Sequence, residues 1–224
     1  MEPMIEISDL ALDAPEGRLL VKGLDLVVPK GGNLLVLGPS GSGKTRFLKV
    51  IGGLEQPAGG SVRVGGRAIW PADGAFGMAG RVSVGFAFAT GGLLSNLSLF
   101  DNVALPLRFR GLPSADISTR VAAALGRMGL TEVADLRPHG VSASGRKHAN
   151  LARVLALDPE LILLDDPLEG LDTADRATAQ EVIQPWASDN KYTLMIASEE
   201  AHSFSHLEAE RLQLSRAPMS MESR

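Results

Sequence analysis

Short apolar runs, separated by turns rich in glycine and proline, fill the first third of the chain. Residues 4–10 and 19–28 alternate apolar and polar side chains or run apolar in short pieces, and 13–17 between them has the composition of a turn. This pattern predicts an antiparallel hairpin. A second, smaller hairpin is predicted at 61–64 and 67–69, on either side of a Gly-Gly pair.

Continuous apolar runs at 34–37 and 161–164 indicate buried strands of a parallel core. Further strands are predicted at 82–88, 192–197 and 211–214. A helix is predicted after the first run, where Phe47, Leu48, Val50 and Ile51 recur at helical spacing. Another helix is predicted from about Thr173, and Pro185 is expected to end or kink it.

Between residues 99 and 136 the apolar positions take helical spacing. One predicted helix begins at Pro113-Ser114 and carries Ile117, Val121, Leu125 and Met128 on a single face. The order of elements therefore predicts an α/β fold with an antiparallel β-rich start, a mostly parallel core, an inserted helical segment and a return to the core. Residues 215–224 are expected to fray.

The spacing G-x-x-x-x-G-K-T joins the first buried run to the first predicted helix. Glycines let successive backbone N–H groups turn toward an anion, and the helix that follows adds the positive end of its dipole. A lysine at this spacing reaches the β- and γ-phosphates of a nucleotide, and the Thr hydroxyl holds Mg²⁺. The alternative is a glycine-rich turn beside an exposed lysine. The predicted nucleotide-binding residues are Gly38, Pro39, Ser40, Gly41, Ser42, Gly43, Lys44 and Thr45.

The second buried run ends in two carboxylates, Asp165 and Asp166, followed by Pro167. An acid at the end of a core strand is the residue type that coordinates Mg²⁺ opposite a phosphate loop, so Thr45 and Asp165 are the predicted metal ligands. Without the phosphate loop, two acids at a strand end would be a weak signal, because they also serve solubility.

Composition narrows the class of protein. The chain has 224 residues, enough for one large α/β domain or a core with an inserted lobe, and a net charge of −4 argues against a nucleic-acid partner. It contains no cysteine, which excludes a disulfide scaffold and cysteine-ligated metal. The first residues lack the pattern of a signal peptide, and no apolar stretch approaches the ~20 residues that a membrane helix needs. Any role at a membrane is therefore expected to depend on a partner.

From the phosphate loop to the paired acids and beyond, the motifs resemble those of the ATP-binding cassette (ABC) ATPases. The matching segments are 38–45, 84–107 at the glutamine-loop region, 141–145 at the signature position, 151–153, 161–167, and 170–172 as the D-loop. The resemblance implies a P-loop NTPase core with an antiparallel β subdomain and a helical subdomain at about 99–145, in a single domain over 1–224. It also implies ATP and Mg²⁺ as cofactors.

Within this family, 91–107 is most similar to the Mla-type ATPases, which energise phospholipid transport with mammalian-cell-entry-type binding proteins. Lipoprotein-releasing and cell-division cassettes share parts of the pattern and remain alternatives. The resemblance implies two partners, an ABC permease in the membrane and a second cassette, as a homodimer or a heterodimer. ATP would lie between the phosphate loop of one cassette and the signature motif of the other, with Ser142 and Ser144 acting in trans. It further implies a peripheral position on the cytoplasmic face of the inner membrane.

Several positions differ from the family pattern, and most of them are positions that carry catalysis in the family. Ala89 occupies the glutamine-loop position and can neither contact Mg²⁺ nor orient water. Asp166 takes the place of the catalytic glutamate and is one methylene shorter, which can cost about a hundredfold in rate. Glu199 replaces the switch histidine, and a carboxylate there would repel a phosphate. The predicted catalytic residues are nevertheless Lys44 and Asp166.

The signature position keeps Ser142 but has Ala143 and Ser144 where the family has glycines, so close approach to a phosphate would be hindered. One alternative is that Ser142 or Ser144 only caps the following helix. Another is that His202 or His206 replaces the lost histidine, whereas surface or packing roles are favoured for His139 and His148.

Two hypotheses follow: a slow but functional transporter ATPase, or a non-hydrolysing nucleotide-binding subunit with a structural or regulatory place in such a complex. Loss of three catalytic contacts favours impaired hydrolysis, with ATP binding and dimer closure surviving better than turnover. A soluble cassette acting on DNA or ribosomes is a third, less favoured class, because the chain is acidic and carries a single cassette.

Overall fold

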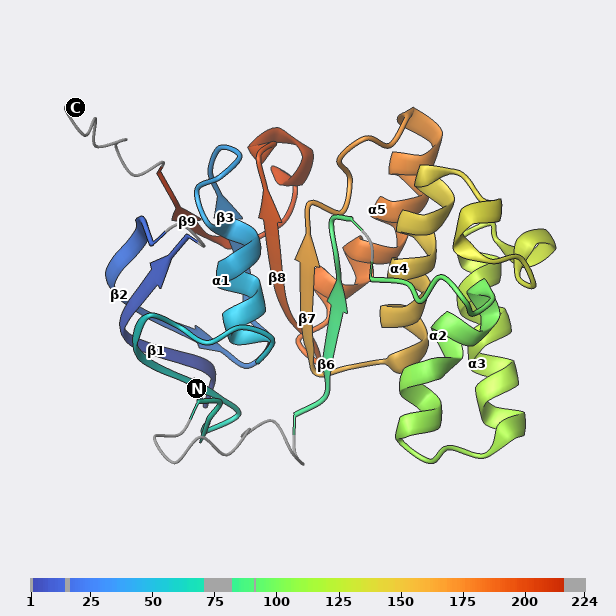
Figure 1. Cartoon of the computed structure of the whole chain (residues 1–224), viewed down its shortest axis with the longest axis horizontal. Coiled ribbons are helices and arrows are strands. Elements are labelled where there is room, and N and C mark those ends of the chain that lie inside the picture. Colours follow the sequence, from blue (N-terminus) through green and yellow to red (C-terminus); the bar gives the residue numbers. More distant parts are fainter. Residues whose placement is uncertain (1, 15–16, 71–81, 91, 216–224) are drawn as a thin grey trace. The chain divides into compact units, whose positions relative to one another are not determined.

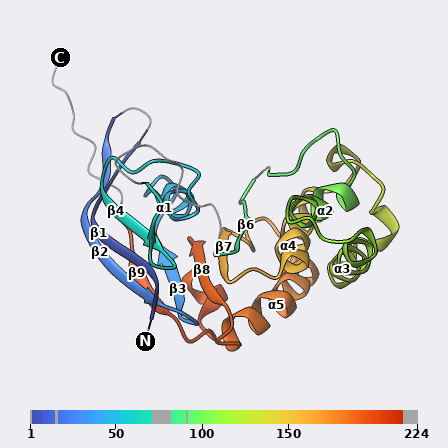
Figure 2. The same cartoon turned by 90° about the horizontal axis from the view of Figure 1, so that it is seen from below.

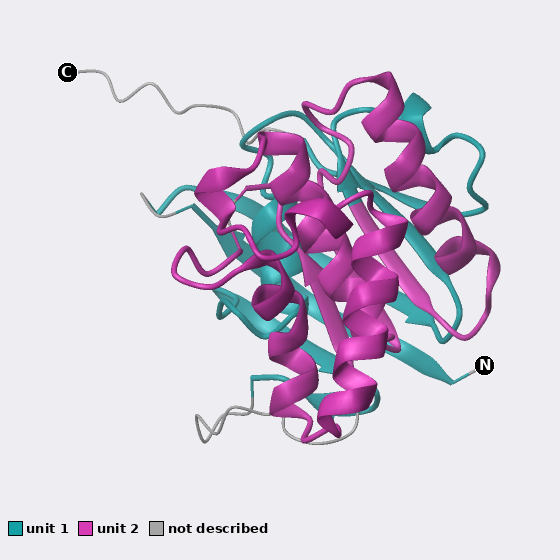
Figure 3. Cartoon of the chain, turned by 90° about the vertical axis from the view of Figure 1, so that its right-hand side faces the viewer, with its two compact units in different colours: residues 1–82, 197–224 teal, residues 83–196 magenta. Residues whose placement is uncertain are grey.

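The computed structural model describes residues 2–14, 17–70, 82–90 and 92–215 (Figure 1). Of the segment 215–224 that is predicted to fray, residues 216–224 lie outside the described residues, as do the turn residues 15–16. The chain divides into two compact units, one formed by 1–82 with 197–224 and the other by 83–196 (Figure 3). The organisation as a single domain with a helical subdomain at about 99–145 stays a prediction.

An antiparallel sheet forms the N-terminal part of the first unit. Strands β1 (Pro3–Asp13) and β2 (Leu19–Pro29) pair as the predicted hairpin, and β4 (Gly59–Val64) and β5 (Arg67–Ala68) extend the sheet in the order β2-β1-β4-β5. In the register, Ile5 lies opposite both Val28 and Val64, and all three side chains are buried. Both hairpins are confirmed.

The same unit contains the strand that leads into the glycine-rich loop. Strand β3 (Asn33–Leu37) pairs in parallel with β9 (Glu210–Gln213), and the pairing continues through a hydrogen bond from the Leu214 amide to the Leu37 carbonyl (2.7 Å). Helix α1 (Lys44–Ile51) follows the loop and contacts β1 and β4. Its predicted apolar residues are all fully buried: Phe47, Leu48, Val50 and Ile51.

Three strands of the second unit lie in the order β6 (Val84–Ala87), β7 (Leu161–Asp165) and β8 (Thr193–Ser198), and the last two residues of β8 are counted with the first unit. Strands β6 and β7 pair in parallel. Every residue of β7 is buried, which explains its uninterrupted apolar sequence.

Four helices pack in the second unit: α2 (Leu99–Phe109), α3 (Ser114–Arg127), α4 (Ala143–Leu157) and α5 (Thr173–Ser188). Helices α2, α3 and α4 lie side by side in both views, and α4 also contacts β6 and α5 (Figures 1 and 2). The predicted apolar face of α3 is confirmed, since Ile117, Val121 and Leu125 are buried and Met128 just beyond the helix is buried with them.

Three short 3-10 helices, η1 (Thr131–Val133), η2 (Pro138–Gly140) and η3 (Ala201–Phe204), complete the elements.

Helix α5 does not end at Pro185, so that part of the prediction is wrong: the helix continues to Ser188. Proline lacks the N–H that would bond the Glu181 carbonyl one turn earlier. Here the Arg127 guanidinium donates to that carbonyl instead, at 3.3 Å. The replacement donor comes from a different helix, which is why the sequence pattern could not indicate it.

Within the described residues, no helix is long and apolar enough to cross a membrane.

Candidate functional site

The glycine-rich loop connects β3 to α1 and has the predicted strand–loop–helix context. Gly38 closes the strand in a crowded position, where a Cβ would overlap the Leu214 carbonyl oxygen and approach Ser42 Oγ to 2.7 Å. Gly41 and Gly43 have positive φ values of 78° and 99°, a conformation that other residues adopt only with strain. The glycine spacing is therefore a requirement of this backbone path.

The loop has the features of an anion site. Pro39, Ser40, Gly41 and Thr45 are exposed, whereas the Ser42 hydroxyl is buried with no hydrogen-bond partner among the described residues. The N-cap of α1 is Gly43, which supplies no side-chain cap, and the first turn of the helix contains no acidic residue. The positive end of the α1 dipole therefore favours a phosphate, and the loop fits a nucleotide.

Lys44 begins α1 and points its ammonium group into this loop. The side chain is 5% exposed, and Nζ donates to the carbonyls of Gly38 (2.8 Å) and Pro39 (3.3 Å). A third group, the carboxylate of Glu199, lies 3.5 Å from Nζ. Glu199 follows directly after β8 and belongs to the same unit as Lys44. The sequence predicts that Glu199 would oppose a phosphate, but the direct ion pair with Lys44 emerges only from the structure.

The paired acids lie in the second unit, at the carboxyl end of β7. Asp165 is its last residue and is 1% exposed, and Asp166 follows with a positive φ of 41°. Asp is among the few residues that tolerate this conformation. Carboxylate and hydroxyl oxygens are hard ligands that suit Mg²⁺. No cluster of three or more His, Cys, Asp or Glu side chains suited to a metal occurs in the described part of the chain. The magnesium ligands predicted from the sequence, Thr45 and Asp165, stay a prediction.

Helix α4 begins at the predicted signature position. Its N-cap is Ser142, whose hydroxyl accepts a hydrogen bond from the Gly145 amide (3.0 Å). The hydroxyls of Ser142 and Ser144 lie 3.0 Å apart. The capping alternative is thus correct for Ser142, and the cap leaves its side chain exposed.

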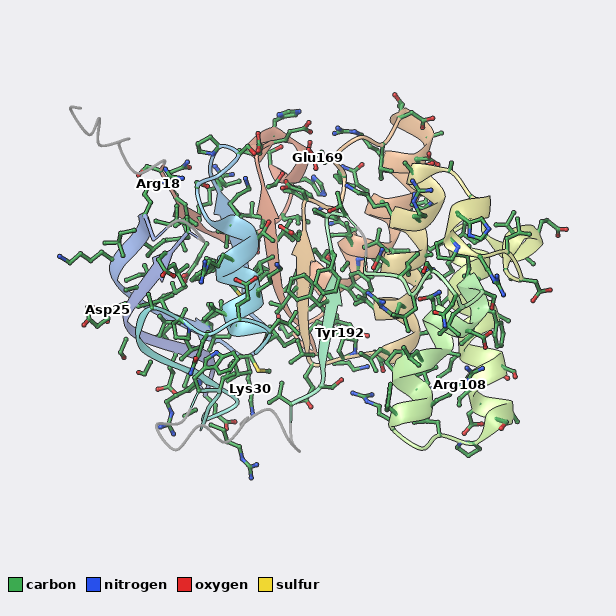
Figure 4. All side chains as sticks on the ribbon, viewed as in Figure 1. Arg18, Asp25, Lys30, Arg108, Glu169 and Tyr192 are labelled. Carbon is green, nitrogen blue, oxygen red and sulfur yellow. The ribbon has the colours of Figure 1, made fainter. Side chains whose placement is uncertain are left out.

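A pocket of 420 Å³ lies beside this N-terminus, within the second unit. Its lining is mixed in polarity and comes from the glutamine-loop region, the start of α4 and the D-loop: Ala89, Thr90, Ala143, Ser144, Arg146, Lys147, Asn150, Glu169, Gly170 and Leu171. Figure 4 shows Glu169 beyond the carboxyl end of β7. Ala89 contributes only a methyl group to this lining, and the neighbouring Thr90 contributes a hydroxyl.

Lys147 is a residue of this pocket that sequence reasoning missed. It is half-buried, and Nζ donates to the carbonyls of Asp166 (2.8 Å) and Glu169 (2.7 Å), which fixes the segment after β7 against α4. Burial lowers the pKa of Lys147, while the carboxylates of Glu169, Asp166 and Asp165 act in the opposite direction. The sequence contains no signal for this role of Lys147, because its partners are backbone carbonyls, which every residue has.

The sequence pattern also predicts no role for Arg153, although this residue lies in one of the segments that carry the resemblance. Its guanidinium donates to the carbonyls of Gly92 and Phe86 (3.4 Å) and to Asn150 Oδ1 (2.8 Å). Burial lowers the pKa of Arg153. The residue therefore ties the end of β6 and the loop after it to α4.

The four histidines take no part in these contacts. His148 is buried, with Nε2 3.1 Å from the Asp175 carbonyl, and His139 is exposed, in agreement with packing and surface roles. His202 has an 82% exposed side chain beside Glu200, and His206 is exposed. Replacement of the switch histidine by either of them stays a prediction.

Comparison with known protein families decides the identity: residues 21–169, more than half of the chain, match the ABC transporter family. The chain belongs to the ABC transporter family. The predicted ATP-binding cassette is thereby confirmed, while the finer resemblance to Mla-type ATPases stays a prediction.

Individual relatives of this cassette serve different systems. It is 37% identical over 175 residues to the methionine import ATP-binding protein MetN of Cereibacter sphaeroides, covering 78% of this chain and 50% of that protein. The cassette thus spans half the length of this relative. It is 30% identical over 202 residues to the lipoprotein-releasing system ATP-binding protein LolD of Geobacter metallireducens, covering 88% and 90%.

Solved structures agree with the predicted fold class. The ATP-binding cassette MJ0796, in a dimeric post-hydrolysis state with ADP and Pi, matches with a TM-score of 0.83 at 22% identity, covering 96% of this chain and 97% of that one. At this identity the likeness shows the fold. The α/β cassette fold, with its parallel and antiparallel sheets, is confirmed.

Proposed function

We propose that this cassette binds Mg·ATP and acts as the nucleotide-binding subunit of a transporter whose hydrolysis is impaired. The observation that carries the proposal is the loop at 38–45, in which an open glycine turn, an uncapped helix start and the buried ammonium of Lys44 converge. Each of these features favours a bound polyphosphate. In this proposal residues Gly38 to Thr45 hold the nucleotide.

Thr45 and Asp165 are the residues that would hold Mg²⁺, which supplies charge neutralisation on the phosphate oxygens when bound. Asp166 would orient the attacking water, at a disadvantage because its side chain is short for that task. The hydrogen bond from Lys147 to its backbone carbonyl supports a fixed position for Asp166. Ser142 and Ser144 would contact the nucleotide of a second cassette, within the limits set by their added Cβ atoms.

The side chains at three positions support impaired hydrolysis. Ala89 brings no polar group to the pocket that it lines. Asp166 is one methylene short of a glutamate. Glu199 sets a negative charge 3.5 Å from Lys44, where a phosphate would otherwise be attracted. These same observations favour the second candidate, a subunit that binds nucleotide and does not hydrolyse it.

The cargo that we propose is phospholipid, moved across a bacterial envelope with an ABC permease and a second cassette. The basis is the segment 91–107, of which the described residues show a tightly fixed loop: the fully buried Asn102 amide bonds the backbone at Leu94, Leu97 and Ser98. This loop presents a half-exposed Leu94 at its surface. In this proposal the loop contacts the permease, which would hold the cassette at the cytoplasmic face of the inner membrane.

Lipoprotein release is the second candidate system, and one observation favours it. The relative named for lipoprotein release aligns over 90% of its own length, whereas the methionine import relative aligns over half. Reconstitution of the cassette with each class of permease in proteoliposomes distinguishes the two. Nucleotide-dependent movement of a labelled phospholipid supports the first system, and release of a lipoprotein to an acceptor supports the second.

Calorimetry with Mg·ATP, together with a steady-state ATPase assay of the permease complex, tests the nucleotide proposal. We expect heat of association with the wild type and none with Lys44→Ala, with turnover of the complex well below that of an intact cassette. Absence of binding to the wild type contradicts ATP binding. Normal turnover that vanishes in Lys44→Ala contradicts the impairment alone.

A further inference from the structure

The Glu199 carboxylate forms an ion pair with the buried ammonium of Lys44. An ammonium group has three N–H donors and no acceptor. Those of Lys44 face two backbone carbonyls, of Gly38 and Pro39, and the Glu199 carboxylate at 3.5 Å. Because Lys44 is 5% exposed, this ion pair is weakly screened on the side of the lysine. The loop thus already contains an anion supplied by the chain itself.

The backbone next to Glu199 is fixed, whereas its side chain is half-exposed. The Glu200 amide donates to Ser198 Oγ (3.1 Å), and the Ser203 hydroxyl donates to the Glu200 carboxylate (2.8 Å). The Glu199 side chain itself is 47% exposed. A ligand can therefore displace the carboxylate into solvent without unfolding the turn. The displaced carboxylate then loses its ion pair with Lys44, and its negative charge stays near the phosphates of the ligand.

From this geometry we propose that Glu199 determines which nucleotide the loop prefers, favouring nucleoside diphosphates over triphosphates. The carboxylate stands in for the terminal phosphate beside Lys44. A diphosphate is compatible with that pair, whereas a triphosphate brings one more anionic group that competes for the same ammonium and is repelled by the carboxylate. This inference rests on the proposed function, namely that the loop at 38–45 binds nucleotide.

The test measures the dissociation constants of Mg·ADP and Mg·ATP by calorimetry for the wild type, Glu199→Gln and Glu208→Gln. Glutamine keeps the size of the side chain and removes its charge, and Glu208 is an exposed acid of the same unit, so both variants change the net charge equally. We expect Glu199→Gln to lower the ratio of Kd for ATP to Kd for ADP about tenfold, through tighter ATP binding. Glu208→Gln should leave the ratio at the wild-type value.

A second variant, Glu199→Ser, also removes the charge and should change the ratio in the same direction, which guards against misfolding of the first. Thermal unfolding of each variant verifies that it is folded. An unchanged ratio in folded Glu199→Gln and Glu199→Ser overturns the inference and leaves nucleotide binding intact. Equal changes for ADP and ATP also overturn it, because they indicate a general effect on the loop. If the wild type and all variants bind neither nucleotide, the proposed function itself fails.

Discussion

At the scale of single residues, one buried and two half-buried polar side chains of the second unit bond the backbone of loops in that unit. The Asn102 amide is fully buried, and its oxygen and nitrogen are both bonded to the loop before α2. Arg153 fastens the loop after β6, and Lys147 fastens the segment after β7. Leaving such backbone groups unpaired costs free energy, so we expect each of these side chains to contribute to the stability of the fold.

The first prediction concerns Arg153. Lysine carries the same charge but lacks the planar fork that reaches several acceptors at once, so Arg153→Lys would leave Phe86 or Gly92 carbonyls unpaired. We expect a loss of about 2 kcal/mol in the free energy of unfolding, measured by urea denaturation. Arg137→Lys, at an exposed position of the same unit, is the matched control and should be neutral. Equal stability of the two variants would contradict the role of Arg153.

At the scale of elements, a polar cluster joins the end of α4 to the start of β8. Asp158 caps α4 in the left-handed conformation, with a φ of 51°, and its carboxylate accepts from Lys191 Nζ (2.7 Å) and from the Tyr192 hydroxyl (2.7 Å). Figure 4 shows Tyr192 at the end of the sheet opposite to Glu169. Partial burial alone would raise the pKa of Asp158, but hydrogen bonds from Lys191 and Tyr192 outweigh it, so the pKa is lowered.

The second prediction follows from the direction of this shift. A carboxyl whose pKa is lower in the folded state contributes stability above its unfolded pKa of about 3.9 and loses it as the pH falls through the folded value. The Asp158→Asn variant lacks this contribution. Its free energy of unfolding should therefore fall less than that of the wild type as the pH is lowered from neutral to acid. Because the pair is at the surface, we expect a difference of about 0.5 kcal/mol.

Urea midpoints measured across the acid range give the comparison, and Asp135→Asn, at an exposed position, is the control. A pH profile of Asp158→Asn that parallels the wild type would show that the cluster does not carry the effect.

At the scale of the whole molecule, the proposed function combines nucleotide binding at 38–45 with impaired hydrolysis at Ala89, Asp166 and Glu199. We therefore expect nucleotide-dependent pairing of cassettes to survive better than turnover. Mg·ATP should shift the wild type toward a dimer in sedimentation velocity, and Lys44→Ala should remain monomeric.

The combined variant Ala89→Gln, Asp166→Glu, Glu199→His restores the side chains of the family pattern and should raise turnover at least about tenfold.

Turnover of the restored variant that stays at the wild-type level would contradict the view that these three positions limit hydrolysis. Each single reversion serves as a control, because catalytic groups that act together are not additive.

Much of the fold followed from patterns that depend only on neighbouring residues. The alternation at 4–10 and 19–28 predicted the β1–β2 hairpin, and the apolar run 161–164 predicted the buried strand β7. The path of α5 through Pro185 did not follow, because the donor that replaces the missing N–H is Arg127 on another helix. Patterns along the chain contain no information about such distant partners.

The sequence by itself determined the glycine-rich connection between β3 and α1, since glycine, lysine and threonine at that spacing meet backbone and charge requirements that are local. It also determined which family the chain resembles, and it carries the prediction that hydrolysis is impaired. Only the tertiary structure decided that Glu199 pairs with Lys44 and that Lys147 and Arg153 hold backbone carbonyls far along the chain. The physical reason is that ion pairs and hydrogen bonds depend on distances in space, which chain folding sets and sequence spacing does not.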